Sequence, residues 1–180
     1  MTRDAMHEHH VIGMVQPIDP RQEGEDAPAV YSTGCAGRIT AFDETDDGRY
    51  LITLTGMCRF AITGELPFID RGYRRVRATY DRYAADLQAP AQDAVERVPL
   101  LSALKACLPS DDACVDWQAL KRMTSDSLVA TLAMLLPFAP SEKQALLEAP
   151  GTGDRARILT TLMTMMAVTG DTGGVEAGLQ

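Results

Sequence analysis

The stretch that decides the fold is residues 47–55, Asp-Gly-Arg-Tyr-Leu-Ile-Thr-Leu-Thr. From Tyr50 onward every second residue is apolar, the period-2 pattern of a half-buried strand, and only Leu51 breaks the alternation. Asp47-Gly48 stands just before this strand and favours a tight turn, because glycine adopts a positive φ without strain. The stretch therefore predicts a β-hairpin with the preceding apolar run, Ile39 to Phe42.

The rest of the first half has the same character, with short apolar runs separated by Gly, Pro and Asp clusters. Strands are expected at Val11–Val15, Cys35–Phe42, Tyr50–Thr55, Arg59–Leu66 and Tyr73–Tyr80. Between the first two runs, Pro17 to Thr33 contains three prolines and the acidic residues Glu23, Glu25 and Asp26. Such a polar segment predicts a mobile surface loop.

From Ala84 onward helix signals replace strand signals. Helices are expected from Asp93 to about Leu108 with a kink at Pro99, over Trp117–Met123, Asp126–Leu136 and Ser141–Leu147, and after Gly153 as far as Gly170. Asp93–Glu96 and Ser141–Gln144 resemble capping boxes, and Leu128, Leu132, Leu135 and Leu136 should form one buried stripe. The sequence thus predicts an α+β protein with a β-rich lobe over residues 1–83, a helical lobe over 84–170 and a flexible tail over 171–180.

Composition limits the partners. The chain has 180 residues, 46% of them hydrophobic, which is sufficient for a folded core. Its net charge of −8 repels phosphate backbones and anionic lipid. No apolar run approaches the roughly 20 residues that span a bilayer, and no signal peptide opens the sequence. A soluble, cytoplasmic protein without membrane contact is expected, and nucleic acid is disfavoured as a partner.

Chemistry-bearing residues are sparse. Cys35, Cys58, Cys107 and Cys114 form no Cys-x-x-Cys pair, and four free thiols are expected. The only histidines, His7, His9 and His10, are candidate metal ligands by their His-x-His-His spacing, although a frayed terminal segment is the favoured interpretation.

Hydrolytic and nucleotide-dependent chemistry find no support. Every candidate base histidine lies in the first ten residues, and no Gly-x-Ser-x-Gly elbow or phosphate-binding Gly-Lys-Ser/Thr loop is present. Paired carboxylates such as Asp46 and Asp47 lie in an exposed turn, where nothing would raise a pKa. Neither catalytic residues nor a cofactor are predicted.

Two surfaces carry alternative functional interpretations. The stretch Arg71 to Arg82 interleaves arginines with tyrosines, and Arg74, Arg75 and Arg77 are candidate contacts to nucleic acid. A solvated strand face is favoured for them, given the overall charge. Met163, Met165 and Met166 are either a soft binding surface or helix core, and core is favoured.

The ordered set of motifs resembles the Lon protease N-terminal, substrate-binding domain family over nearly the whole chain. Residues 30–39 are similar to its Gly-x-x-Gly-x-Ile strand, residues 47–60 to its most specific segment, and residues 135–148 to its helical signature. The positions that carry the resemblance are Gly34, Gly37, Ile39, Gly48, Gly56, Arg59, Phe60, Pro137 and Pro140.

The resemblance implies a small PUA-like β-barrel lobe followed by a helical bundle. It also implies no enzymatic activity, because the family's ATPase and Ser-Lys protease domains are absent from the sequence. The family's first two strands are missing as well, so a misassigned start codon or a truncated form is expected, with unpaired sheet edges and uncovered apolar surface.

The function expected on this basis is a non-catalytic module that recognises unfolded or partly folded polypeptides, or degradation signals, for a partner such as a protease. The alternative is RNA binding by a PUA-like domain through the Arg71–Arg82 strand. No residue constellation supports a small-molecule site, and the sequence does not indicate an oligomeric state.

Overall fold

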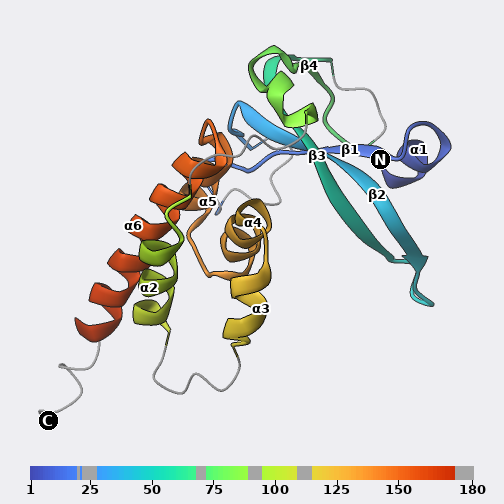
Figure 1. Cartoon of the computed structure of the whole chain (residues 1–180). Helices are drawn as coiled ribbons and strands as arrows, with labels where there is room; N and C mark the ends of the chain where they lie inside the picture. Colours follow the sequence, from blue (N-terminus) through green and yellow to red (C-terminus); the bar gives the residue numbers. More distant parts are fainter. Residues whose placement is uncertain (20, 22–27, 68–71, 89–94, 109–114, 173–180) are drawn as a thin grey trace, which may run out of the picture. The chain divides into compact units, whose positions relative to one another are not determined.

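The computed structural model describes residues 1–19, 21, 28–67, 72–88, 95–108 and 115–172 (Figure 1). The chain divides into two compact units, Met1–Ala89 and Pro90–Gln180, which we call the sheet unit and the helical unit. The sequence had placed this division after residue 83. The structure keeps the segment Asp81–Leu87 with the sheet, because it packs against a central strand.

The sheet unit begins with helix α1 (Thr2–His7) and contains a four-stranded antiparallel sheet in the order β1-β2-β3-β4. Its strands are β1 (Val11–Met14), β2 (Thr33–Glu44), β3 (Tyr50–Glu65) and β4 (Val76–Thr79), and the 3₁₀ helix η2 (Asp81–Leu87) follows. This arrangement confirms the mixed α+β class. The resemblance implies a β-barrel. The strands in the described residues form one four-stranded sheet, with β1 and β4 at its edges.

The predicted hairpin is present, with Glu44 pairing with Tyr50 across a turn in which Gly48 has a φ of 79°. The sequence was wrong to expect two strands after this turn, because β3 is continuous through residues 56–58. A register shift opposite Ala36 and Gly37 leaves Met57 as an extra residue on β3. This β-bulge lets the strand continue where the alternation of side chains is interrupted.

Two other expectations for the sheet unit need correction. Strand β4 is shorter than the predicted Tyr73–Tyr80. Both ends of the predicted loop Pro17–Thr33 are tied down, since Pro17 bridges Val30 and the Ile18 amide donates to the Ala29 carbonyl at 2.8 Å. The acidic residues expected in the middle of that loop lie outside the described residues.

The helical unit contains α2 (Arg97–Cys107), α3 (Trp117–Arg122), α4 (Ser125–Leu135), α5 (Pro140–Glu148) and α6 (Thr152–Thr172). Its core is a single apolar cluster whose fully buried members include Leu100, Leu128, Val129, Leu159 and Met163. The cluster draws on α2, α4, α5 and α6, so that each of these helices buries one stripe of side chains.

Several predicted helix ends are displaced. Helix α2 begins at Arg97, which places Pro99 in the first turn. Backbone amides in the first turn of a helix have no intrahelical partner, so proline removes no hydrogen bond there and the predicted kink is not expected. Residues 93 and 94 of the proposed capping box lie outside the described residues. Helix α5 begins one residue earlier than predicted, with Ala139 rather than Ser141 as its N-cap. Helix α6 continues through Gly170 to Thr172.

The predicted leucine stripe of α4 is correct at Leu128, Leu132 and Leu136, which are buried. It is wrong at Leu135, which is 76% exposed, and Val129 takes that place in the core. The helical period alone does not explain this exchange, because Leu135 follows Leu132 by three residues and Leu128 by seven and so lies on the same side of the helix; the buried face is instead shifted toward Val129.

Candidate functional site

The far end of the β2–β3 hairpin extends beyond the other strands of the sheet (Figure 1), and most of its residues are exposed. Strand β1 pairs only with residues 35–38 of β2, and β4 only with residues 61–65 of β3. Residues 40–53 therefore form a two-stranded ribbon, and residues 54–57 continue β3 with only β2 paired beside them; we call residues 40–57 the distal ribbon. Within the described parts of the chain, no further strand pairs with either of its outer edges.

Large apolar side chains lie exposed on the distal ribbon. Leu51 is 62% exposed, Phe42 40% and Met57 36%. The Phe42 ring packs against the Tyr50 ring with centroids 5.1 Å apart, and the two lie on the same face because Phe42 opposes Ile52. A shallow hollow is lined by Ala41, Phe42, Asp43, Leu51, Ile52 and Thr53. Leu51 lies on the opposite face, across from Asp43, so exposed apolar side chains occur on both faces of the ribbon.

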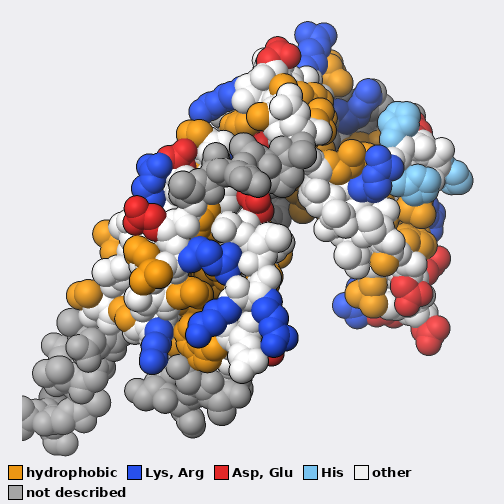
Figure 2. Space-filling model, in the orientation of Figure 1, with side chains coloured by type: hydrophobic (Ala, Val, Ile, Leu, Met, Phe, Trp, Pro, Cys, Tyr) orange, Lys and Arg blue, Asp and Glu red, His pale blue; other side chains and the backbone are white. Residues whose placement is uncertain are grey.

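The tip of the distal ribbon is acidic, and we call the residues Asp43, Glu44, Asp46 and Asp47 the acidic tip. Asp47 has local partners: the Arg49 side chain donates to it at 2.7 Å, and hydrogen bonds from Thr45 and Arg49 lower the pKa of its carboxyl group. The other three carboxylates are exposed. Figure 2 shows acidic side chains at the end of the hairpin, next to hydrophobic ones.

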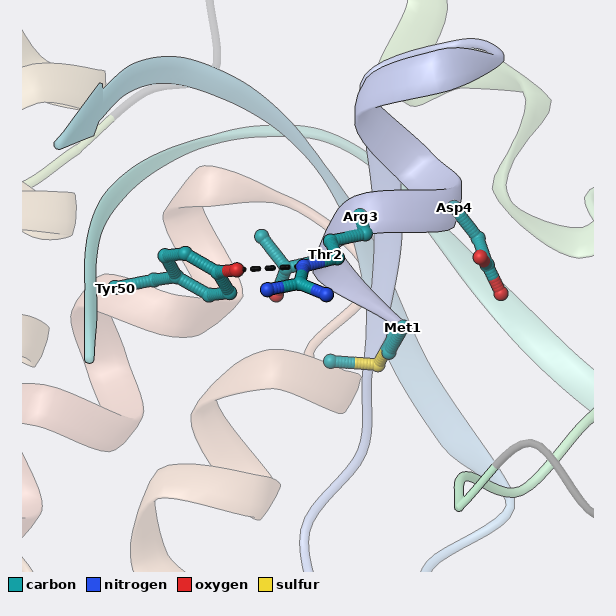
Figure 3. Close-up of a pocket in the computed structure, with 5 residues that line it drawn as sticks. All are labelled: Met1, Thr2, Arg3, Asp4 and Tyr50. Atoms are coloured by element: carbon teal, nitrogen blue, oxygen red, sulfur yellow. Dashed lines mark hydrogen bonds between the residues drawn. The ribbon is translucent and has the colours of Figure 1, made fainter. Parts of the chain in front are cut away.

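An open hollow of about 450 Å³ lies between α1 and the hairpin (Figure 3). Residues 1–4 and Tyr50 line it, and the Arg3 Nε donates to the Tyr50 hydroxyl at 2.7 Å. The Arg3 guanidinium also lies 5.8 Å from the centre of that ring. These contacts hold the first helix against the sheet and leave Tyr50 in place beside the acidic tip.

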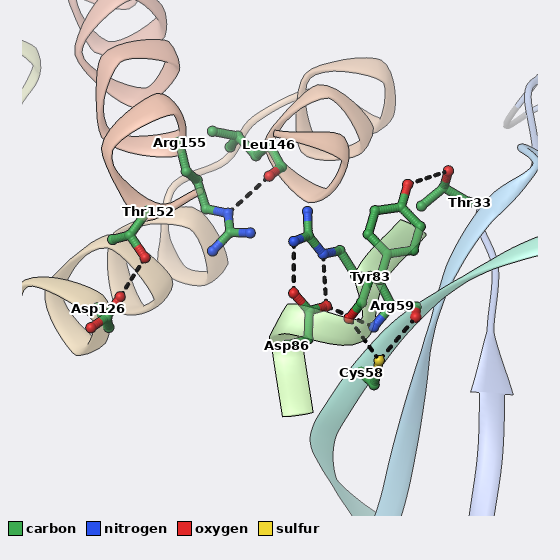
Figure 4. Close-up of polar contacts among 9 residues, drawn as sticks. All are labelled: Thr33, Cys58, Arg59, Tyr83, Asp86, Asp126, Leu146, Thr152 and Arg155. Atoms are coloured by element: carbon green, nitrogen blue, oxygen red, sulfur yellow. Dashed lines mark hydrogen bonds and ion pairs between the residues drawn. The ribbon is translucent and has the colours of Figure 1, made fainter. Parts of the chain in front are cut away.

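Arg59, a motif residue, is a buried structural cation rather than a surface contact (Figure 4). Its Nε and Nη2 donate to Asp86 of η2 at 2.8 and 2.7 Å, and its backbone amide donates to the same carboxylate at 3.0 Å. The guanidinium lies 4.6 Å from the centre of the Tyr83 ring, and the Tyr83 hydroxyl bonds to Thr33. Hydrogen bonding to Asp86 raises the pKa of Arg59 further. This cluster fastens η2 onto β3.

The candidate nucleic-acid residues do not form a concentrated basic site. Arg74 is committed to an ion pair with Glu65 and to the Pro28 carbonyl. Arg75 and Arg77 are exposed, while Arg71 lies outside the described residues.

The neighbouring tyrosines have structural roles. The Tyr73 hydroxyl donates to Asp4 at 2.8 Å, the Tyr80 ring meets Phe60 edge-on, and Tyr83 is buried. Only Tyr80 is more than a third exposed, so aromatic rings for base stacking are few here.

The remaining motif residues support the fold. Gly34 and Gly37 allow close strand packing, with Gly37 facing Leu54, and Ile39 and Phe60 are buried. The site of Gly56 is looser, since an added Cβ would lie 3.7 Å from the Cys35 sulfur. Gly48 forms the turn, Pro137 follows α4, and Pro140 is the first residue of α5, where its missing amide hydrogen costs nothing.

The histidine and cysteine candidates show no assembled site. Across the described residues, no three His, Cys, Asp or Glu side chains come together as metal ligands, so His7, His9 and His10 do not form such a group. Cys35, Cys58 and Cys107 are free thiols, and burial raises the pKa of each. Cys114 lies outside the described residues.

The methionines of α6 divide between core and surface. Met163 is fully buried in the core cluster, whereas Met165 is 60% exposed.

None of the described helices is long and apolar enough to cross a bilayer.

Sequence reasoning did not select Phe42 and Leu51 as surface residues. The signal for Leu51 was present, because it is the residue that breaks the period-2 pattern. A leucine on the polar face of a strand is exposed if that face meets solvent, and the structure shows that it does. A similar signal existed for Phe42, which stands three residues after Ile39 and so falls in step with the polar Arg38 and Thr40.

The fold, a meander sheet followed by a set of packed helices, is that of Lon N-terminal domains. The crystal structure of a Lon N-terminal domain protein from Xanthomonas campestris matches with a TM-score of 0.51 and 20% identity, over 84% of this chain and 88% of that chain. The N-terminal domain of the Mycobacterium avium complex Lon protease matches with a TM-score of 0.51 and 16% identity, over 86% and 89%. No curated protein sequence gave a match.

The family model for the ATP-dependent protease La (LON) substrate-binding domain matches residues 1–165. The chain belongs to this family. The matched region is the substrate-binding domain of that family, which confirms the family resemblance seen in the sequence.

Proposed function

We propose that this domain binds unfolded polypeptide segments or degradation signals and presents them to a partner protease. The family match over residues 1–165 carries this proposal, since the domain that the model describes is a substrate-binding one. The exposed apolar side chains of the distal ribbon supply a surface of suitable chemistry, because an unfolded chain offers the apolar side chains that a folded one buries.

The alternative, RNA binding through Arg74, Arg75 and Arg77, has less support. Arg74 is tied to Glu65, and the net charge of −8 opposes phosphate.

Binding of an unfolded polypeptide tests the proposal. The probe is a fluorescein-labelled disulfide protein that has been reduced and carboxymethylated so that it stays unfolded, and the control is its native, disulfide-intact form. Fluorescence anisotropy should show saturable binding of the unfolded probe and none of the native one. Equal affinity for both forms, or for neither, would contradict the proposed function.

Variants on the surface locate the binding. Leu51→Ser removes the most exposed apolar side chain of the distal ribbon without touching the core and should weaken binding severalfold. Val168→Ser is a matched control, since Val168 is 63% exposed on α6 in the helical unit. It should leave the affinity unchanged.

A further inference from the structure

Helix α3 is weakly held compared with the other described helices of the helical unit. It has six residues and no buried side chain, whereas α2, α4, α5 and α6 each bury at least two. A helix this short is not stable in water without tertiary contacts. Segments with few buried apolar side chains are the first to open in a native protein, so the contacts of α3 decide whether it stays in place.

The inner side of α3 is apolar. Trp117 and Leu120 lie three residues apart on one side of the helix, and Met123 directly follows its end. All three side chains are partly buried against the core cluster of the helical unit. Lys121 and Arg122, on the other side, are exposed. We call the part of the core cluster beneath these three apolar side chains the covered surface, because α3 separates it from water.

Polar contacts fix the two ends of α3. At its start, Asp116 Oδ1 accepts hydrogen bonds from two backbone amides of the first turn, at 3.0 and 2.9 Å. At its end, the Arg97 guanidinium of α2 donates to the Leu120 and Met123 carbonyls, both at 3.0 Å. The last carbonyls of a helix have no partner within it, so Arg97 supplies bonds that α3 cannot make for itself.

The connection to α4 allows α3 to move without unwinding its neighbour. Met123 and Thr124 separate the two helices and are both extended, with ψ angles of 148° and 158°. The Thr124 side chain caps α4 by accepting a hydrogen bond from the Ser127 amide. The start of α4 is therefore stabilised independently of α3, and rotation at two extended residues suffices to carry α3 away.

We infer that α3 is a displaceable lid, and that an apolar segment of an unfolded polypeptide takes its place on the covered surface. This inference rests on the proposed function and adds a second contact surface to the distal ribbon. The lid itself defines the occupant, which is a segment able to form a helical turn with apolar side chains three residues apart and with carbonyls that Arg97 can bind. The apparent affinity then depends on the fraction of molecules whose lid is open.

Trp117 reports on the lid, because it is the only tryptophan of the chain. The probe is a reduced and carboxymethylated disulfide protein that contains no tryptophan and carries no label. Acrylamide should quench the Trp117 emission more strongly when this probe is bound, because the ring has left the core cluster for water. Unchanged quenching at saturating probe, or stronger protection, would overturn the inference.

Variants of the lid test the opening equilibrium. Asp116→Ala removes the cap of α3 without altering the covered surface and should tighten binding of the unfolded probe about fivefold, the effect of a cap worth about 1 kcal/mol. Leu120→Ala weakens the packing of the lid and should act in the same direction. Glu96→Ala is the matched control, because Glu96 is also an acidic N-cap residue but accepts no capping bond. It should leave the affinity unchanged, and circular dichroism establishes that each variant is folded.

The outcomes separate the two proposals. If the wild-type chain binds the probe with unchanged Trp117 quenching, and Asp116→Ala binds it no more tightly than Glu96→Ala, the lid is wrong and the proposed function stands. If neither the wild-type chain nor the lid variants bind the probe, both proposals fail. Weaker binding by Asp116→Ala and Leu120→Ala would make α3 part of the binding surface rather than its cover and would also overturn the inference.

Discussion

Gly34 shows how a single residue is determined by its surroundings. A Cβ built on it would lie 2.6 Å from the Met14 carbonyl oxygen, the Phe60 ring and the Val15 side chain. The side chains could shift, but the carbonyl belongs to the neighbouring strand β1 and is held in the ladder. Only glycine lets β1 and β2 approach this closely above the Phe60 ring.

We therefore expect Gly34→Ala to lower the free energy of unfolding by about 2 kcal/mol or more, the cost of overpacking a buried site. Gly64→Ala is the matched control, because it lies on β3 with nothing within 4 Å of the added methyl group. It should change stability by less than about 0.5 kcal/mol. Urea unfolding followed by circular dichroism compares the two, and equal losses would contradict this account.

Among the elements, η2 is joined to β3 by the ion pair of Arg59 with Asp86 as well as by the contacts of Tyr83. The side chains of Arg59 and Asp86 are 9% and 21% exposed, and three hydrogen bonds join the two residues. A buried cation without its partner is costly because it has lost its water and gained nothing in return. The motif arginine thus maintains the architecture that carries the distal ribbon.

Asp86→Asn should accordingly destabilise the sheet unit by about 3 kcal/mol, as expected for breaking a largely buried pair. The control is Arg49→Gln, whose side chain is 84% exposed in its pair with Asp47 and should contribute less than about 1 kcal/mol. Chemical denaturation monitored by fluorescence of the tyrosines in the sheet unit provides the readout. A loss for Asp86→Asn no larger than that for Arg49→Gln would show that the pair is not what holds η2.

At the scale of the whole molecule, charge decides between the classes of partner. A net charge of −8 produces a field that repels nucleic acid and attracts basic segments. Arg75 and Arg77 are exposed, but two charges on one short strand do not reverse this field.

A labelled twenty-nucleotide RNA should consequently show no saturable binding at micromolar chain concentrations in 150 mM salt. The Arg75→Glu/Arg77→Glu variant should bind the unfolded probe as the wild-type chain does. RNA binding that saturates, weakens steeply with salt and disappears in this variant would instead support the nucleic-acid alternative, because phosphate neutralisation releases counterions.

Local patterns in the sequence determined the kind of most elements, although α1 and η2 were not predicted from them. Short apolar runs between Gly, Pro and Asp clusters predicted strands in the first half, and alternation together with Asp47-Gly48 predicted the hairpin. Capping-box patterns and apolar stripes predicted helices where α2 to α6 are found. Helix ends were less well predicted, since Asp116 and Thr124 cap α3 and α4 through side-chain bonds to backbone amides that only the structure reveals. The family resemblance also depended on local motifs and was recognisable without coordinates.

Tertiary structure decided what each side of these elements faces. A period-2 pattern does not say how far the neighbouring strands extend, so the length of β3 and the exposure of the distal ribbon were not predictable from it. Arg59 was a motif residue in the sequence and became a buried partner of Asp86 only through a contact between residues 27 positions apart. The periodicity of apolar residues is a local property, so the sequence determines it. Exposure depends on which distant segments pair with one another, and the candidate binding surface of this protein is defined by exposure.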